Sequence, residues 1–300
     1  MNLWQLIKKE YNGEIPIQSF RELNGFNQRL GSWGAVTDNS RYFKSLLREH
    51  SKFLDRQILE SSNLPNGLCG FLKNIKNRQL GNPISIKYKD MDVDIDYLLS
   101  VEEMFFLHNT LDESETILEI GAGFGRLAHS ILQNFSTIKK YYLVDIDFML
   151  DLQKEFLSNV LSKNELEKIE YISIKNYQQL NNIDLTINID SFQEMPEEII
   201  LEYLKFISKK SKSFFSRNAV CKYHPSLIDI TSFNQKQFDS AMGMGLSRKV
   251  VDIYDDADLE IARIEHIKAY CPKSFEVAKT LDFFGQYHYY HLVLYQRINE

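Results

Sequence analysis

Residues 116–126 read TILEIGAGFGR, a short apolar strand that passes through three glycines into the start of a helix. Glycine lets the backbone approach a ligand closely, and the first turn of a helix offers N–H groups that have no partner within the helix. The glycines stand at 121, 123 and 125 as GxGxG, whereas the dinucleotide fingerprint GxGxxG needs its third glycine at position 126, which is Arg126. The stretch therefore predicts a nucleotide-type ligand and argues against a Rossmann dehydrogenase.

Glu119 stands two residues before the first glycine and places a carboxylate near this loop. That carboxylate would repel a pyrophosphate and attract a cationic ligand such as an ammonium or a sulfonium. A tight turn between strand and helix is the simpler explanation of the glycines alone. We favour ligand binding, because the glycines occur together with Glu119 and with Asp145, which ends the next predicted strand, KYYLVD.

Strands and helices alternate from about residue 96 onward. The predicted strands span 116–120, 140–145, 169–174, 185–190 and 213–218, and the predicted helices span 126–135, 148–161 and 196–210. Such alternation is typical of a parallel sheet covered on both faces, with a ligand crevice at the carboxyl ends of the strands. A tyrosine-rich strand at about 287–297 is expected to form an antiparallel edge. The predicted fold class is thus Rossmann-like α/β, with a mostly parallel sheet and an antiparallel last strand.

The first part of the chain has a different texture. A helix is expected over about 40–61, followed by breaks at 65–67 and at the GNP turn 81–83, and then by an extended piece at 84–88. We therefore expect two domains. Residues 1–95 would form a mainly helical cap, and residues 96–300 would form the α/β domain.

Composition excludes several classes of protein. The 300 residues hold 35 Lys and Arg against 41 Asp and Glu, a net charge of −6, which disfavours an electrostatic nucleic-acid binder. No segment approaches the roughly 20 apolar residues of a membrane span, and the chain begins without the pattern of a signal peptide, so we expect a cytoplasmic protein. Cys69, Cys221 and Cys271 form no CxxC pair, so neither a disulfide framework nor a structural zinc site is expected.

Residues 118–126 resemble the first motif of class I S-adenosylmethionine-dependent methyltransferases. The resemblance continues to Asp145, 145 − 121 = 24 positions after Gly121, where that family grips the ribose hydroxyls. It implies an adenine contact at residues 176–177 and a methyl-transfer site after the strand at 185–190. The cofactor-binding residues that it implies are Glu119, Gly121, Ala122, Gly123, Gly125, Arg126, Asp145, Ile146, Asn176, Tyr177, Asp190 and Ser191.

A narrower resemblance rests on GNP at 81–83, on the Asp96-Tyr97-Leu98-Leu99 helix start and on SFQEM at 191–195. Together these segments are similar to the sugar O-methyltransferases of bacterial polysaccharide gene clusters. That resemblance implies methyl transfer to a sugar hydroxyl of a surface polysaccharide or its precursor. Two alternatives stay open: a methyltransferase of a non-sugar small molecule, acting on oxygen or nitrogen, and a non-catalytic S-adenosylmethionine-binding protein.

A sugar hydroxyl is a weak nucleophile at neutral pH and benefits from a positioned base. We expect Glu194 or His224 to be that base and Asp190 to orient the base or the acceptor. Glu194 could instead stabilise the start of the helix at 196, and His224 could be an ordinary loop histidine. Asp190 and Glu194 could also hold a divalent cation, although no ligand pattern indicates a metal.

The expected cap carries aromatic residues that could act as a lid over the acceptor. Trp33, Tyr42, Phe43 and Tyr88 have faces suited to stacking on pyranose rings. We favour core packing for them, because aromatic side chains are more often buried than functional.

Overall fold

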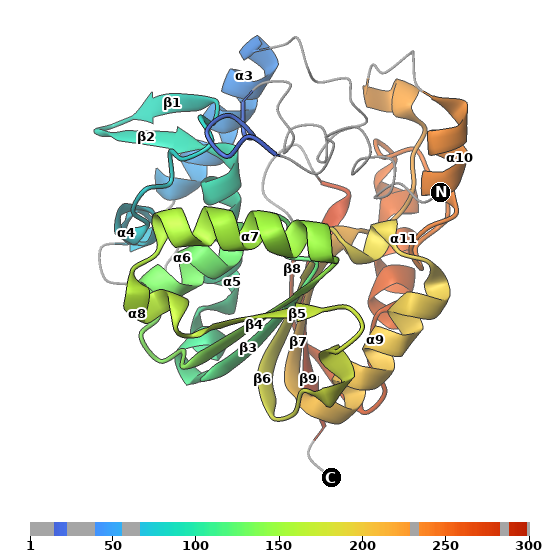
Figure 1. Ribbon diagram of the computed structural model, residues 1–300. Coiled ribbons are helices and arrows are strands. Elements are labelled where there is room, and N and C mark those ends of the chain that lie inside the picture. The colour runs from blue at the N-terminus through green and yellow to red at the C-terminus, as the bar shows by residue number, and fades with distance from the viewer. Residues whose placement is uncertain (1–14, 23–39, 56–66, 229–233, 283–287, 299–300) are drawn as a thin grey trace.

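The computed structural model describes residues 15–22, 40–55, 67–228, 234–282 and 288–298. Its centre is a seven-stranded sheet in the order β5-β4-β3-β6-β7-β9-β8 (Figure 1). The strands are β3 (Thr116–Ile120), β4 (Lys140–Asp145), β5 (Ile169–Ser173), β6 (Ile183–Ile189), β7 (Ser211–Ala219), β8 (Phe275–Asp282) and β9 (Tyr290–Arg297). Strands β3 to β7 are parallel, and β9 runs antiparallel to both of its neighbours. The predicted Rossmann-like fold, with its antiparallel last strand, is confirmed.

One expectation about the sheet is wrong. The tyrosine-rich strand β9 does not form the edge, because it pairs with β7 on one side and with β8 on the other. The edge strand is β8, which we did not predict. Its pairing with β9 slips between Val277 and Lys279, and Val277 is exposed. This irregularity removes the plain alternation by which a strand is recognised in sequence.

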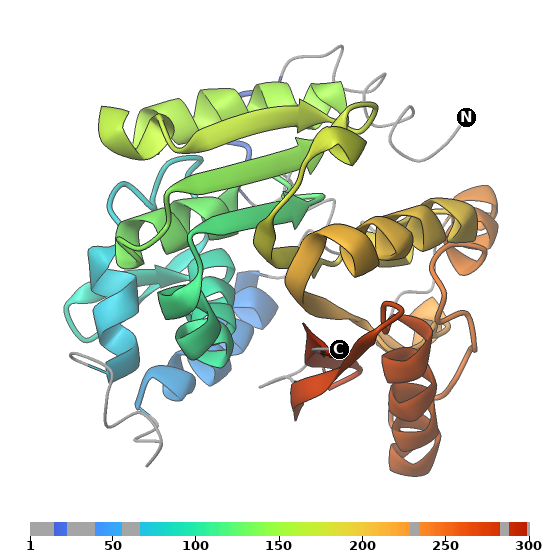
Figure 2. The same cartoon turned by 90° about the horizontal axis from the view of Figure 1, so that it is seen from below.

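Helices cover both faces of the sheet (Figures 1 and 2). One face packs against α5 (Ile95–Glu113), α6 (Arg126–Asn134) and α7 (Asp147–Val160), and the other packs against α9 (Glu197–Lys210). Two-sided burial explains why the central strands are apolar at successive positions: in β3, Ile117 faces the first core and Leu118 the second. The other α-helices described after residue 95 are α8 (Lys163–Leu166), α10 (Gln235–Met242) and α11 (Asp256–Ala269).

The described part of residues 1–95 joins the same core as α5 and α6. It contains α3 (Ser40–Ser51), a 3-10 turn (Lys52–Asp55), α4 (Gly67–Asn74) and a hairpin of β1 (Ser85–Tyr88) and β2 (Met91–Asp94). Helix α3 ends ten residues before the predicted limit at Ser61, and residues 56–61 lie outside the described part. Leu47 of α3 and Leu72 of α4 are buried in the cluster that holds the α5 and α6 side chains.

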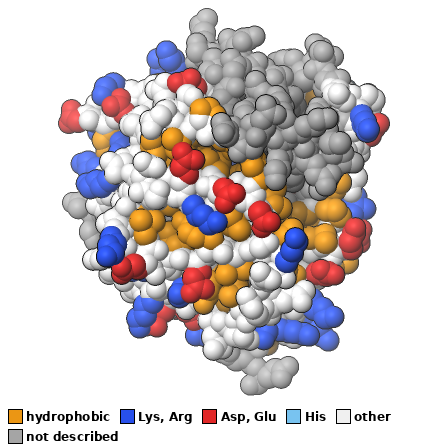
Figure 3. Space-filling model, in the orientation of Figure 1, with side chains coloured by type: hydrophobic (Ala, Val, Ile, Leu, Met, Phe, Trp, Pro, Cys, Tyr) orange, Lys and Arg blue, Asp and Glu red, His pale blue; other side chains and the backbone are white. Residues whose placement is uncertain are grey.

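Of the four aromatic residues considered for a lid, Tyr88 is the one whose side chain lies in the described part of the chain. Trp33 and the side chains of Tyr42 and Phe43 lie outside the described residues, and Tyr88 of β1 packs half-buried against the core. On the face drawn in Figure 3, acidic and basic side chains are interspersed. Within the described ranges, no helix combines the length and the apolar character needed to cross a bilayer.

Candidate functional site

The glycine loop leaves β3 at Ile120 and enters α6 at Arg126. Gly121, Gly123 and Gly125 have φ angles of 73°, 58° and 93°, a backbone region that other residues rarely adopt. A Cβ atom on Gly121 would lie 2.3 Å from Ser191 Oγ, whereas a Cβ on Gly123 would meet nothing within 4 Å. Gly121 is therefore required by packing, and Gly123 leaves one side of the loop open to a ligand.

Asp145 ends β4 beside this loop. Its Oδ1 accepts a hydrogen bond from the Ile146 N–H at 2.9 Å, and its Oδ2 accepts one from Gln153 Nε2 at 2.9 Å. Gln153 Nε2 also donates to the Gly123 carbonyl at 2.9 Å. Burial raises the pKa of Asp145 to about 7, against the effect of these hydrogen bonds. The loop and the carboxylate are thus held in one arrangement by Gln153, a residue of α7 that we did not predict.

Glu119 is buried rather than exposed on the loop. The residue is only 3% exposed, and its Oε2 accepts a hydrogen bond from the Tyr141 hydroxyl at 2.6 Å. Burial raises the pKa of Glu119 to about 8, so the neutral acid predominates at pH 7. The Glu119 side chain therefore connects β3 to Tyr141 of β4 in the interior.

Arg126 fastens the first turn of α6 to α5. Its Nη1 donates to Glu103 Oε2 at 2.7 Å and to Ser100 Oγ at 2.7 Å, and its Nη2 donates to Glu103 Oε1 at 3.1 Å. Such a two-pronged arginine–carboxylate pair fixes both position and orientation. Glu103 is fully buried and was not among the predicted residues.

The residues expected at the adenine separate into two environments. Asn176 is exposed after β5, where its N–H donates to the Ser173 carbonyl at 2.8 Å. Tyr177 is buried, with its ring centroid 4.5 Å from that of Tyr203 and 5.1 Å from that of Phe206. Of this pair, only Asn176 presents its side chain at the surface, and the Tyr177 ring belongs to the core.

The end of β6 is joined to the end of β3. Ser191 Oγ donates to the Ile120 carbonyl at 3.0 Å, and Asn188 Nδ2 donates to the same carbonyl at 3.1 Å. The two side chains also contact each other at 2.5 Å. Ser191 therefore sets how close the glycine loop lies to the segment that follows β6.

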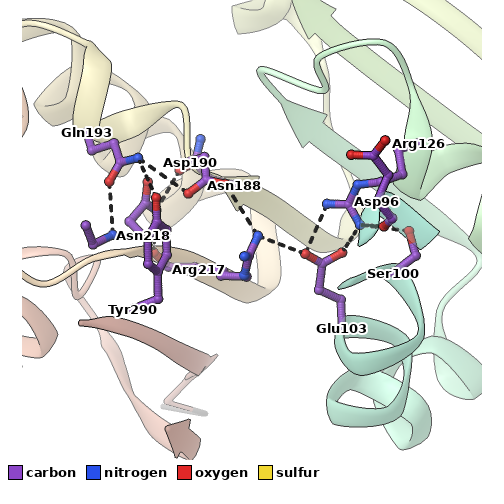
Figure 4. Close-up of polar contacts among 12 residues, drawn as sticks. Asp96, Ser100, Glu103, Arg126, Asn188, Asp190, Gln193, Arg217, Asn218 and Tyr290 are labelled. Carbon is purple, nitrogen blue, oxygen red and sulfur yellow. Dashed lines mark hydrogen bonds and ion pairs between the residues drawn. The ribbon is translucent and has the colours of Figure 1, made fainter. Parts of the chain in front are cut away.

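Asp190 lies at the turn after β6, in the left-handed region at φ 60°. Its Oδ2 is 3.4 Å from Arg217 Nη1, and its Oδ1 is 3.4 Å from Gln193 Nε2 (Figure 4). Gln193 Nε2 is also 3.2 Å from the Tyr290 hydroxyl. A strained residue held by several neighbours is characteristic of functional sites.

Glu194 and His224 lie in different surroundings. Glu194 is half-buried, and its pKa is raised to about 8, first by burial and then by the negative charge of Asp190, while Lys222 opposes the shift. Lys222 Nζ donates to the Gln193 carbonyl at 3.0 Å. His224 is exposed, and its Nδ1 is 2.7 Å from Ser226 Oγ. Of the two candidate bases, Glu194 is the one placed beside Asp190.

Among the described residues, no group of three or more His, Cys, Asp or Glu side chains is placed to hold a metal ion. The Asp190 carboxylate accepts hydrogen bonds from Gln193 Nε2 and Arg217 Nη1.

Comparison with known proteins gives matches only among solved structures. No protein-family profile matches the chain, and no curated protein matches it at significance. An O-methyltransferase candidate from Klebsiella pneumoniae is 11% identical with a TM-score of 0.48, covering 86% of this chain and 100% of its own. The methyltransferase domain of a bacterial Hen1 protein is 11% identical at 0.47, covering 67% and 97%. Mitomycin 7-O-methyltransferase is 10% identical at 0.44, covering 99% and 76%. These three TM-scores lie below 0.5, so the chemistry of the site rests on this chain's own residues.

Proposed function

We propose that this chain is an S-adenosylmethionine-dependent O-methyltransferase. The observation that carries the proposal is that Gln153 donates hydrogen bonds to both the Gly123 carbonyl and the Asp145 carboxylate, at the carboxyl ends of β3 and β4. These ends lie beside the point where the strand order changes direction, since β3 is followed in sequence by β4 on one side and paired with β6 on the other. Ligands of open α/β sheets bind at such a point.

The residues present fit this cofactor. The Asp145 carboxylate suits the two hydroxyls of a ribose, and the open side of Gly123 leaves space for a ligand close to the backbone. Asn176 is available at the end of β5 for polar contact with a base. When bound, S-adenosylmethionine supplies a methyl group activated by a positive sulfur.

Glu194 is the proposed general base. Its raised pKa of about 8 keeps a fraction ionised at neutral pH and makes it basic enough to accept a hydroxyl proton. Glu194 would take that proton as the acceptor oxygen bonds to the methyl carbon and the methyl–sulfur bond breaks, with its electron pair staying on sulfur and S-adenosylhomocysteine as the leaving group. Asp190, 42% exposed at its side chain, would accept a hydrogen bond from the acceptor and orient it.

We further propose that the acceptor is a sugar hydroxyl of a bacterial surface polysaccharide or its precursor. Three groups that hydrogen-bond well to hydroxyls follow β6, namely Asp190, Gln193 and Glu194, and this supports a polyhydroxylated acceptor. The segment SFQEM, on which the resemblance to sugar O-methyltransferases rests, contains two of them. Residues 1–95 would contribute to recognition of the acceptor.

Two measurements test this function. Isothermal titration should show binding of S-adenosylmethionine and S-adenosylhomocysteine, and no binding of NADH. Incubation with S-adenosylmethionine and a panel of methyl glycosides of common hexoses and deoxyhexoses should release S-adenosylhomocysteine. Binding without release from sugars or from small non-sugar alcohols and amines would favour a non-catalytic binding protein.

Variants then identify the base. Glu194→Gln should lower the rate of release by about a hundred- to ten-thousandfold, because general-base catalysis contributes that much. His224→Ala should have a smaller effect, because its ring is exposed and bonded to Ser226. Unchanged rates in both variants would remove both residues as the base.

A further inference from the structure

Arg217 joins two charged groups that come from different elements. Its side chain, on β7, is 3% exposed, with Nη1 3.1 Å from Glu103 Oε1 and 3.4 Å from Asp190 Oδ2. Its guanidinium carbon lies 5.2 Å from the centroid of the Tyr290 ring. Figure 4 shows Arg217 between Glu103 of α5 and Asp190. One guanidinium therefore connects helix α5 to the carboxylate at the end of β6.

Glu103 is shared by two buried arginines. Arg126 reaches its two oxygens at 2.7 and 3.1 Å, and Arg217 makes the third contact. One carboxylate compensates only one of the two guanidinium charges. Two other acids lie near Arg126: Asp96, whose carboxylate also pairs with Arg21 at 2.9 Å, and Glu119, which is mainly neutral at pH 7 because burial raises its pKa to about 8. Asp190, with its Oδ2 3.4 Å from Arg217 Nη1, supplies a further negative charge to the guanidinium that shares Glu103 with Arg126.

Charged and polar groups from several elements act on the Asp190 carboxylate. Burial raises the pKa of Asp190 above its ordinary value, and the more distant Glu103 adds to this, whereas Arg217 of β7 and the Tyr290 hydroxyl of β9 favour the ionised form. Glu194, four residues further along the chain, interacts with it as a like charge. Arg126 of α6 adds a weaker favourable effect. Arg217 is the largest of the favourable influences.

We propose that Arg217 is a positioning residue that holds Asp190 ionised and oriented for the acceptor, and that links it through Glu103 to Arg126 on the helix following the glycine loop. This inference rests on the proposed methyl transfer. A fixed, ionised Asp190 accepts a hydrogen bond from the acceptor hydroxyl and aligns its oxygen. Because Arg217 and Arg126 both bind Glu103, the Asp190 carboxylate and the start of α6 are held in a fixed position relative to each other.

The charge of Asp190 can be measured without turnover. In protein labelled with ¹³C at the aspartate carboxyl carbons, the Asp190 resonance is identified by its loss in Asp190→Asn. Arg217→Met should raise the pH at which this resonance titrates by about one to three pH units. Arg217→Lys keeps the charge and should raise it less. If the Asp190 resonance titrates at the same pH in wild type and in Arg217→Met, the proposal is wrong.

The matched control removes a cation at the opposite end of β7. Lys212 Nζ pairs with Asp184 of β6 at 2.7 Å, and the Lys212 side chain is 77% exposed. Lys212→Met should leave the Asp190 titration and the release of S-adenosylhomocysteine unchanged. The Arg217 and Lys212 variants should retain the wild-type affinity for S-adenosylmethionine within about twofold, measured by isothermal titration, because Gln153 holds Gly123 and Asp145 in place.

A double-mutant cycle separates positioning from a structural role. With the methyl glycoside panel, Arg217→Met should lower release of S-adenosylhomocysteine by about a hundredfold, but should lower it no further in the Asp190→Asn background. If the two losses multiply instead, Arg217 does not act through Asp190, and the proposal is wrong. If wild type binds the cofactor but releases no product from any acceptor, the proposed function fails, while the titration still decides whether Arg217 controls Asp190.

Discussion

Gly121 and Gly123 share a left-handed backbone but differ in what surrounds them. The cost of placing alanine in that region is about 1–2 kcal/mol at either position. At Gly121 the added Cβ also meets Ser191 Oγ at 2.3 Å, a distance at which atoms must move. At Gly123 it meets nothing within 4 Å, so the substitution would affect a ligand more than the fold.

We expect Gly121→Ala to lower the free energy of unfolding by more than Gly123→Ala, as measured by chemical denaturation. Ser191→Gly should recover part of the Gly121→Ala loss, because it removes both atoms that clash. Gly123→Ala should keep more of its stability yet lose about tenfold or more in affinity for S-adenosylmethionine, because a methyl group then occupies the open side of the loop. Equal stability losses, with no rescue by Ser191→Gly, would contradict this assignment.

Asp145 predicts a pH dependence of cofactor binding. Its pKa, raised to about 7 by burial, means that the ionised acceptor predominates only above pH 7. Hydrogen bonds from ribose hydroxyls are stronger to the ionised form, so the dissociation constant for S-adenosylmethionine should rise by up to about tenfold as pH falls from about 8 to 6. Asp145→Asn should bind more weakly and lose this dependence.

The control for that titration is Glu194, whose pKa of about 8 places it in the same pH range. Glu194→Gln should keep the dependence of the dissociation constant on pH between about 6 and 8, because Asp145 still titrates. If the dissociation constant is independent of pH in Glu194→Gln but still depends on pH in Asp145→Asn, then Glu194 and not Asp145 causes the pH dependence.

Local sequence could reveal only the part of the site that lies near the glycines. The loop and Asp145 are recognised by their spacing along successive strands. Glu103 is not, because it meets Arg126 across 23 positions and Arg217 across 114. No short pattern marks such a contact. The same holds for Gln153, which resembles any other polar residue of a helix until its amide is seen beside Asp145 and Gly123.

Among the elements, the central strands were the most predictable. The predicted limits at 116–120 and 140–145 coincide with β3 and β4, because a strand buried on both faces is a continuous apolar run between polar turns. Only the first residues of α5 were anticipated. Its 19 residues are buried on many sides, with Glu102 and Glu103 among them, so it shows no single apolar stripe.

The segment at 15–22 is fixed to the glycine loop by contacts that explain the GNP turn. The Arg21 N–H donates to the Gly81 carbonyl at 2.9 Å, and Arg21 Nε pairs with Asp96 at 2.9 Å. The Phe20 ring lies 5.2 Å from that of Phe124 in the glycine loop. Arg21 is fully buried and also pairs with Asp94 at the start of α5. The GNP turn at 81–83 and the start of α5 therefore form one structural unit with residues 15–22.

Arg21→Met should lower the free energy of unfolding by about 3–5 kcal/mol, because it leaves Asp94 buried without its charge partner. It should also weaken S-adenosylmethionine binding, since the Arg21 guanidinium lies 5.3 Å from the Phe124 ring. Chemical denaturation and isothermal titration measure the two effects. The control is Lys52→Met, which removes an exposed pair with Glu49 and should cost at most about 1 kcal/mol. If Arg21→Met and Lys52→Met lower the free energy of unfolding and the affinity for S-adenosylmethionine equally, the buried ion pairs of Arg21 do not stabilise this part of the fold.

The whole molecule is built on a core that crosses the expected boundary at residue 95. Leu47 and Leu72 share one buried cluster with Leu107 of α5, Ile131 of α6 and Phe156 of α7. Parts that share a core unfold together, so a ligand bound at the glycine loop should stabilise the N-terminal helices as well. This makes thermal unfolding a report on the cofactor site.

At a concentration about 100 times its dissociation constant, S-adenosylmethionine should stabilise the protein by about 2.7 kcal/mol. For a chain of this size, that should raise the Tm by about 4 °C in a single transition seen by both circular dichroism and tyrosine fluorescence. S-adenosylhomocysteine should act similarly, whereas NADH at the same concentration should not, because the third glycine of the dinucleotide fingerprint is replaced by Arg126. Two separate transitions, with only the later one moved by the ligand, would mean that the α3–α4 region folds independently of the α/β part of the chain.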